Sequence, residues 1–158
     1  MTQRLYDRTS RTISYDDVDP ALRAAIEQHA EERLLGPVRP VAVVDTHSVN
    51  LKKGGLFGRL AGRSEKEHRT VALLLPQALV VVTTGAERGV VVMSTRLPDI
   101  ARIGGRDPQL IVDSGVSVES RWNGHNQDIV SYYVGLGDDP AGREFQDRLR
   151  AAVVAARQ

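Results

Sequence analysis

Residues 78–95 read ALVVVTTGAERGVVVMST, two apolar runs rich in valine that are separated by GAER at 85–88. Short apolar runs with many β-branched side chains, joined by a few residues that include glycine, are typical of neighbouring antiparallel strands. The stretch therefore predicts a hairpin with strands at 78–84 and 89–95.

The strand pattern continues on both sides of this hairpin. Upstream, VAVVDTHSVNL at 41–51 and TVALLL at 70–75 alternate or run apolar over the length of a strand. Downstream, DIARI at 99–103 predicts a short edge strand, and the regions 108–122 and 128–136 predict two more strand regions. Many short strands with few residues between them indicate a sandwich or a barrel, and not βαβ units.

Two amphipathic helices are predicted, and each starts with the same device. Asp19-Pro20 and Asp139-Pro140 place an N-cap side chain before a proline whose missing N–H costs nothing in the first helical turn. The first helix, about 20–35, has its apolar residues near helical spacing at Leu22, Ile26, Ala30 and Leu34, and ends at Gly36-Pro37. The second has its apolar face at Phe145, Leu149, Ala152, Val153 and Ala156.

The segment before residue 38 differs from the strand-rich remainder. Its first twelve residues are polar and aperiodic, which predicts a tail or an extended arm. We therefore divide the chain into an N-terminal arm and helix at 1–37, packed on a strand-rich part at 38–158. No linker or repeat separates the two parts, so one structural domain is expected.

Composition limits the classes of function. The chain has 158 residues and no cysteine, which excludes disulfides, thiolate metal sites and a cysteine nucleophile. The first twenty residues lack the apolar core of a signal peptide, and the longest apolar runs are far below the ~20 residues of a membrane span. We expect a cytoplasmic protein. A net charge of +1 gives no overall signal for nucleic-acid binding.

The order of these elements resembles the pleckstrin homology (PH) superfold, and bacterial PH-like domains in particular. The resemblance is carried by the hairpin at 78–95, by STRLPDIARI at 94–103 and by the segment from Tyr133 to Arg150, and it covers roughly residues 40–157. It implies an α+β, mainly β fold: a PH-like antiparallel barrel or sandwich of about seven strands, closed by the C-terminal helix. The helix at 20–35 is additional to that pattern.

The segment KKGGLFGRLAGRSEKEHR at 52–69 holds six basic and two acidic residues. PH domains that bind inositol phosphates place basic side chains at the ends of their first two strands. The resemblance therefore implies a ligand site here, whose basic members are Lys52, Lys53, Arg59, Arg63 and Arg69. Guanidinium and ammonium groups form short, charge-assisted hydrogen bonds to phosphate oxygens.

Three interpretations of this segment stay open. Leu56, Phe57 and Leu60 could enter a bilayer surface while the basic residues meet anionic lipid, which would make the protein peripheral to the membrane. The segment could instead contact a protein. It could also be a solvated loop without a partner, which is the common case for a glycine-rich charged connection.

No catalytic or metal motif is complete. GRLAGRS at 58–64 has three residues between its glycines where a phosphate-binding loop has four, and it precedes a strand and not a helix. The four histidines are scattered without the spacing of metal ligands, and singly bonded or solvated imidazoles are expected.

Of Trp122, Tyr132 and Tyr133, at least two are expected in the core.

The sequence thus favours a non-enzymatic interaction or scaffolding module that binds a protein partner or another copy of itself. A peripheral binder of anionic lipid or of a phosphorylated ligand, acting through 52–69, is the alternative. Neither a cofactor nor nucleic acid is expected as a ligand.

Overall fold

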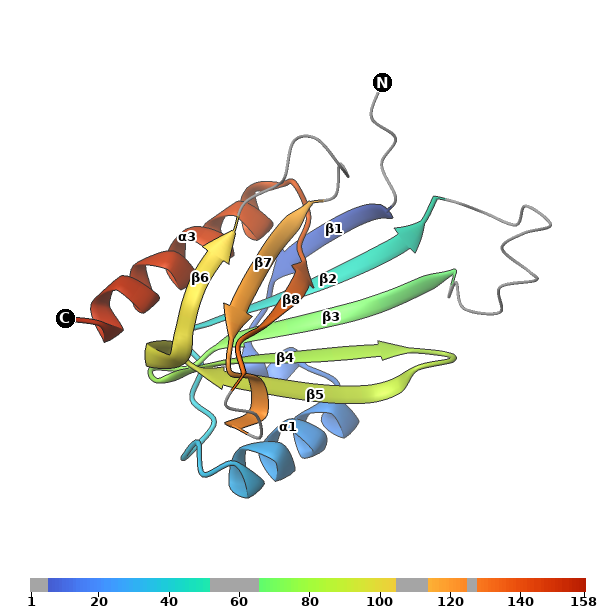
Figure 1. Ribbon diagram of the computed structural model, residues 1–158. Coiled ribbons are helices and arrows are strands. Elements are labelled where there is room, and N and C mark those ends of the chain that lie inside the picture. Colours follow the sequence, from blue (N-terminus) through green and yellow to red (C-terminus); the bar gives the residue numbers. More distant parts are fainter. Residues whose placement is uncertain (1–5, 52–65, 105–113, 125–127) are drawn as a thin grey trace.

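The computed structural model describes residues 6–51, 66–104, 114–124 and 128–158. Its strands form two antiparallel sheets (Figure 1). The five-stranded sheet has the order β1-β2-β3-β4-β5, with strands Tyr6–Thr12, Ala42–Asn50, Glu67–Leu74, Ala78–Gly85 and Gly89–Arg96. The three-stranded sheet has the order β6-β7-β8, with strands Ile100–Gly104, Gly115–Ser120 and Val130–Gly135. The short 3-10 turns are η1 (Tyr15–Asp17), η2 (Leu97–Asp99) and η3 (Trp122–Gly124).

The predicted hairpin at 78–95 is confirmed as β4 and β5, which pair from Ala78 with Arg96 to Gly85 with Gly89. The expected α+β, mainly β class with a C-terminal helix is confirmed too. In the described part of the chain no backbone ladder joins the two sheets. Closure into a barrel therefore stays a prediction.

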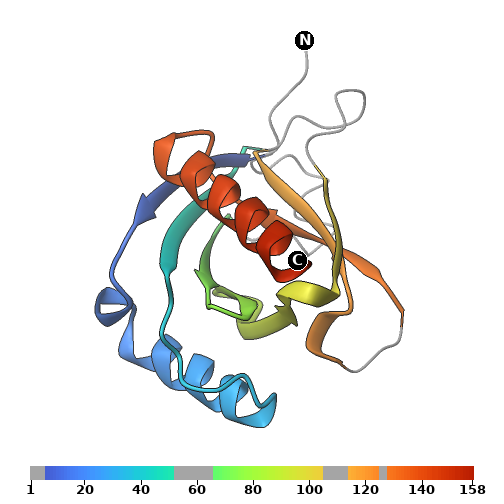
Figure 2. The same cartoon turned by 90° about the vertical axis from the view of Figure 1, so that its left-hand side faces the viewer.

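Helix α3 (Pro140–Ala156) lies across one opening between the sheets (Figure 2). Its apolar face is buried as expected, with Phe145, Leu149 and Val153 in a core that both sheets share. Asp139 caps the helix, because its Oδ1 accepts a hydrogen bond from the backbone N of Gly142 at 2.9 Å. Burying an aromatic or leucine side chain contributes roughly 1.5 to 3 kcal/mol, so these contacts fix the helix on the sheets.

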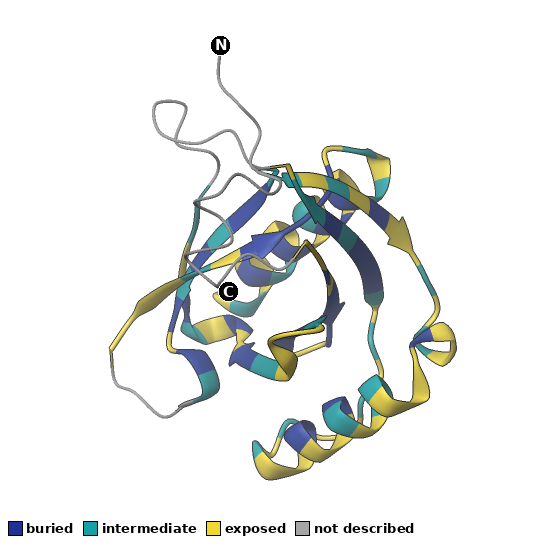
Figure 3. Ribbon diagram, turned by 90° about the vertical axis from the view of Figure 1, so that its right-hand side faces the viewer, coloured by how far each residue is buried: buried dark blue, intermediate teal, exposed yellow. Residues whose placement is uncertain are grey.

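Helix α1 (Pro20–Glu32) covers the opposite face of the five-stranded sheet (Figures 1 and 3). Ile26 and Ala30 are buried against a second apolar cluster formed mainly by β3 and β4. The prediction for Leu34 was wrong: this side chain is 81% exposed. The helix ends at Glu32 and Leu34 adopts a left-handed φ of 57°, which takes its side chain off the apolar stripe.

The first residues were expected to form a tail or an extended arm, and the tail alternative is wrong for residues 6–12, because they form β1, an extended edge strand of the larger sheet. β1 pairs with β2 from Tyr6 opposite Asn50 to Thr12 opposite Val44. Only Ser10 in this strand is buried, so its sequence carries no apolar alternation. The backbone ladder and the Ser10 contacts hold the strand, and neither leaves a hydrophobic pattern in the sequence.

Ser10 joins β1 to the segment that follows β8. Its hydroxyl oxygen accepts a hydrogen bond from the backbone N of Gly137 at 2.7 Å and lies 2.6 Å from the Thr46 hydroxyl. Its own backbone N donates to Asp139 Oδ2 at 2.8 Å. The two sheets are therefore bridged beside β1 by side-chain bonds instead of a ladder.

Candidate functional site

The inner face of the five-stranded sheet changes from apolar to polar along its length. Because alternate residues of a strand share a face, Leu74, Ala72, Thr70 and His68 of β3 lie in one row. The first two belong to the shared core, whereas Thr70 and His68 are buried polar residues beyond it. Thr83 of β4 continues the row of Leu79 and Val81 in the same way. The inner face of the sheet therefore has a buried polar surface beside the shared apolar core.

A cavity of about 170 Å³ lies over this surface. We call it the polar pocket; its lining comes from β1, β3, β4, β8 and the turn between β4 and β5, and consists of Tyr6, Arg8, His68, Thr70, Thr83, Arg88, Tyr132, Tyr133 and Gly135. Two guanidinium groups line it, and no carboxylate does so from the described residues. The described lining of the pocket is therefore polar and basic.

Aromatic rings position Arg8. Its guanidinium carbon lies 4.5 Å from the ring centre of Tyr6 and 5.8 Å from that of Tyr133, and its Nη1 donates to the Ser48 hydroxyl at 3.3 Å. The Tyr6 ring also meets the His68 ring edge-on, with 5.5 Å between centres. Stacking over aromatic rings orients a guanidinium group.

Gly135 leaves the space that Arg8 occupies. A Cβ built at residue 135 would fall on the Arg8 guanidinium, so any larger residue would displace it. Three residues earlier on β8, burial raises the pKa of Tyr132, and the charge of Arg88 together with a hydrogen bond to Thr83 offsets part of that rise. The Tyr132 phenol therefore stays protonated at neutral pH and can donate a hydrogen bond.

Of the residues predicted to bind a ligand, Lys52, Lys53, Phe57, Arg59 and Arg63 lie outside the described residues. The structure places Arg69 on β3, next to His68 and Thr70 but on the opposite face of the sheet. There its Nη1 lies 2.9 Å from Asp45 Oδ2, an atom that Arg11 Nη2 also reaches at 3.1 Å. The described structure thus does not bring Arg69 into the polar pocket.

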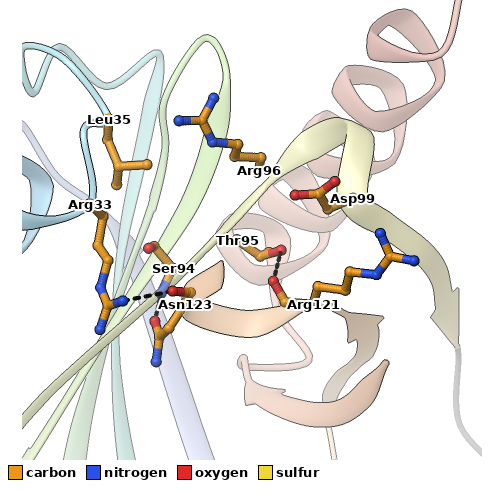
Figure 4. Close-up of a pocket in the computed structure, with 8 residues that line it drawn as sticks. All are labelled: Arg33, Leu35, Ser94, Thr95, Arg96, Asp99, Arg121 and Asn123. Atoms are coloured by element: carbon orange, nitrogen blue, oxygen red, sulfur yellow. Dashed lines mark hydrogen bonds between the residues drawn. The ribbon is translucent and has the colours of Figure 1, made fainter. Parts of the chain in front are cut away.

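A second, smaller cavity of about 70 Å³ lies where the end of α1 meets β5 and η3 (Figure 4). We call it the arginine pocket; it is lined by Arg33, Leu35, Ser94, Thr95, Arg96, Asp99, Arg121 and Asn123. Arg33 Nη1 donates to the backbone oxygen of Asn123 at 2.8 Å, and the backbone N of Ser94 donates to Asn123 Oδ1 at 2.9 Å. These bonds connect the helix to both sheets.

His29 belongs to this connection. It is 8% exposed, and its Nε2 lies 2.8 Å from the Ser94 hydroxyl. Burial lowers the pKa of His29, and the nearby Arg33 lowers it further, while Glu32 opposes them. The imidazole is therefore neutral at pH 7, in agreement with the expected singly bonded histidine.

The expected core role of the aromatic residues is confirmed for Trp122, which is buried, and for Tyr132, which packs against the shared core. Their ring centres are 5.2 Å apart. Tyr133 is 41% exposed and lines the polar pocket.

Comparison with known protein families, curated proteins and solved structures finds no match to this chain. Among the described residues no group of three or more acidic, histidine or cysteine side chains is placed to hold a metal ion. No helix in that part of the chain has both the length and the apolar character needed to cross a membrane.

Sequence reasoning missed the polar pocket for two reasons. Arg8 and Tyr6 lie in the segment interpreted as a tail or an extended arm, and His68 was treated as one of four scattered histidines. The available signal was the continuation of the β3 row from Leu74 to His68, which replaces apolar with polar side chains on a buried face.

Proposed function

We propose that the chain is a non-enzymatic binding module with a PH-like arrangement, and that its ligand carries a phosphate group held in the polar pocket. The observation that carries the proposal is the composition of the lining: Arg8 and Arg88 border a polar cavity to which the described residues contribute no carboxylate. Such a site attracts an anion, because ion pairing at a partly desolvated surface is stronger than in bulk water.

The donors around the cavity suit phosphate in particular. Guanidinium groups offer paired N–H donors, which match two phosphate oxygens, and the Tyr132 phenol and the Thr70 and Thr83 hydroxyls add neutral donors. The PH-like arrangement is supported by the order of strands followed by a C-terminal helix that covers one opening between the sheets.

The phosphate can belong to a soluble molecule or to a lipid headgroup, and two assays separate these sources. Inorganic phosphate is titrated into the protein by calorimetry at low and high salt, and sedimentation is compared for vesicles of phosphatidylcholine with and without phosphatidylserine. Arg8→Gln and Arg88→Gln are the test variants. Arg39→Gln is the matched control, because Arg39 is exposed and lies outside the polar pocket.

Salt-sensitive binding of inorganic phosphate that weakens by about tenfold in Arg8→Gln supports the proposal, since a charged hydrogen bond contributes roughly 1.5 to 3 kcal/mol. Binding to anionic vesicles that depends on Arg8 assigns the phosphate to a lipid. Vesicle binding that depends on Lys52 and Lys53 instead would support the predicted role of segment 52–69. Absence of all binding overturns the anionic-ligand proposal.

A protein contact is a second candidate, favoured by Val90 and Val91, which are exposed on the edge strand β5. A second copy can pair with the outer edge of β5 in the antiparallel sense, which gives a twofold dimer. Sedimentation equilibrium tests this: a dimer that Val91→Lys dissociates supports it, and a monomer at all concentrations excludes it.

A further inference from the structure

The end of α1 and the connection to β2 enclose an open groove of about 610 Å³, which we call the α1 groove. Figure 2 shows the connection turning back beside the helix, on the outside of the molecule. Ala30 and Leu34 line the groove from the helix end, Pro37 and Val38 line it from the connection, and both walls add charged side chains. The α1 groove shares no lining residue with the polar pocket, which lies on the opposite face of the five-stranded sheet.

Leu34 is held in solvent at the mouth of this groove. It is 81% exposed and adopts a left-handed φ of 57°, a conformation that costs a side chain about tenfold in population relative to glycine. The N–H of Leu35 donates to the Ala30 oxygen at 2.9 Å, and these residues fix the turn. The Leu34 oxygen accepts a hydrogen bond from Arg96 Nη2 at 3.5 Å. Glycine, the usual residue at such a helix end, would avoid both the strain and the exposure, so an apolar side chain kept here suits contact with a partner.

The two walls of the α1 groove carry opposite charges that do not pair. Glu31 on the helix and Arg39 on the connection are both exposed. No ion pair or hydrogen bond joins their side chains to each other or to another residue in the described part of the chain. The third charged member, Glu27, already accepts a hydrogen bond from the Tyr15 hydroxyl at 3.3 Å. One unpaired charge of each sign makes the lining complementary to itself, because a twofold axis brings Glu31 of each copy to the partner's Arg39.

We propose that the α1 groove docks a second copy of this chain about a twofold axis. Leu34 of each copy enters the groove of the other, against Pro37 and Val38, while Glu31 meets the partner's Arg39. A partner of a single charge sign fits less well, since it would pair with one of the two charges and repel the other. The contact goes beyond phosphate binding and uses another surface than the edge of β5. Because the polar pockets lie on the far face of the sheet, the dimer presents both of them.

Charge reversal tests the reciprocal pairing by sedimentation equilibrium. Glu31→Arg places two guanidinium groups opposite each other at both contacts, and Arg39→Glu places two carboxylates there. Each variant alone should raise the dimer dissociation constant by at least about tenfold. In an equimolar mixture of the two variants every contact joins opposite charges, so association should be restored. Asp147→Arg, at an exposed position of α3, is the matched control and should leave association unchanged.

Leu34→Asn separates a docking role of Leu34 from a local structural one. Asparagine tolerates the left-handed conformation better than leucine does, so urea unfolding of the monomer should show no loss of stability. The dimer dissociation constant should nevertheless rise by at least about tenfold, because the apolar contact is lost. Val154→Asn, which replaces a 60% exposed valine on α3, is the control and should leave association unchanged.

A native chain that stays monomeric at every concentration overturns the proposal. A dimer that survives Leu34→Asn also overturns it, and so does a mixture of the two charge variants that fails to associate. If Val91→Lys dissociates the dimer while Leu34→Asn does not, the contact lies at β5 and not at the α1 groove. Phosphate binding is measured independently, so its failure and the failure of docking are distinguishable.

Discussion

Replacing Gly135 with alanine should weaken phosphate binding without unfolding the protein. The added Cβ falls on the Arg8 guanidinium, which is the far end of a flexible side chain and can swing away. The cost to folding is the loss of the contacts of Arg8 with Ser48 and with the Tyr6 ring, about 1 kcal/mol. Removing one charged hydrogen bond to the ligand, worth roughly 1.5 to 3 kcal/mol, weakens the affinity by about 10- to 150-fold.

Gly142→Ala is the matched comparison, because its Cβ overlaps the backbone oxygen of Gly137, which cannot swing away. We expect this variant to lose about 1 to 3 kcal/mol of stability, and to lose less affinity than Gly135→Ala, because its clash does not involve Arg8. Calorimetry with inorganic phosphate measures the affinity, and urea unfolding measures the stability of each variant.

A double-mutant cycle tests whether Gly135 acts through Arg8. If it does, Gly135→Ala combined with Arg8→Gln binds phosphate no more weakly than Arg8→Gln alone. Full additivity of the two losses, or a native affinity in Gly135→Ala, would refute the reasoning that Gly135 positions a ligand-binding guanidinium.

Three further variants test the fold and its pH dependence. The pKa of His29 is lowered in the folded state, so the unfolded chain binds the proton more tightly and the free energy of unfolding falls as the pH drops below about 6.5. His29→Gln should flatten this pH dependence in urea unfolding between pH 5 and 8. An unchanged pH dependence in the variant would contradict the prediction. Asp139→Ala removes the acceptors for the backbone N–H groups of Gly142 and Ser10. The free energy of unfolding, measured by thermal unfolding, should therefore fall by about 1 to 3 kcal/mol. An unchanged stability would exclude the capping role of Asp139. Ile26→Ala, at a fully buried position, should lower the free energy of unfolding by about 2 to 5 kcal/mol in urea. Ala24→Ser, at an exposed position of the same helix, should change it by no more than about 0.5 kcal/mol. Equal losses in the two variants would show that α1 does not pack on the sheet.

The elements that the sequence predicts well are those whose stability comes from buried apolar side chains. The β4–β5 hairpin and α3 belong to this class, because their apolar residues, such as Val80, Val81 and Leu149, are the buried ones, so the apolar pattern alone predicts the element. β1 could not be predicted in this way, since its partners are backbone groups and the hydroxyl of Ser10.

The predicted basic site stays a prediction, because most of segment 52–69 lies outside the described residues. The described structure adds arginine side chains at two cavities that the sequence did not indicate. Both clusters assemble residues distant in sequence: Arg8 meets Gly135, and Arg33 meets Asn123. Such convergence depends on tertiary packing, which no local pattern encodes.

The contact between Ser10 and Asp139 spans 129 residues of sequence. During synthesis at roughly 5 to 20 residues per second, Asp139 is added about 6 to 26 s after Ser10, so this contact forms well after β2, the ladder partner of β1, has been made. β1 also carries Tyr6 and Arg8, which complete the polar pocket. The strand that carries Tyr6 and Arg8 is therefore held in part by a bond that only a chain extending to Asp139 can make.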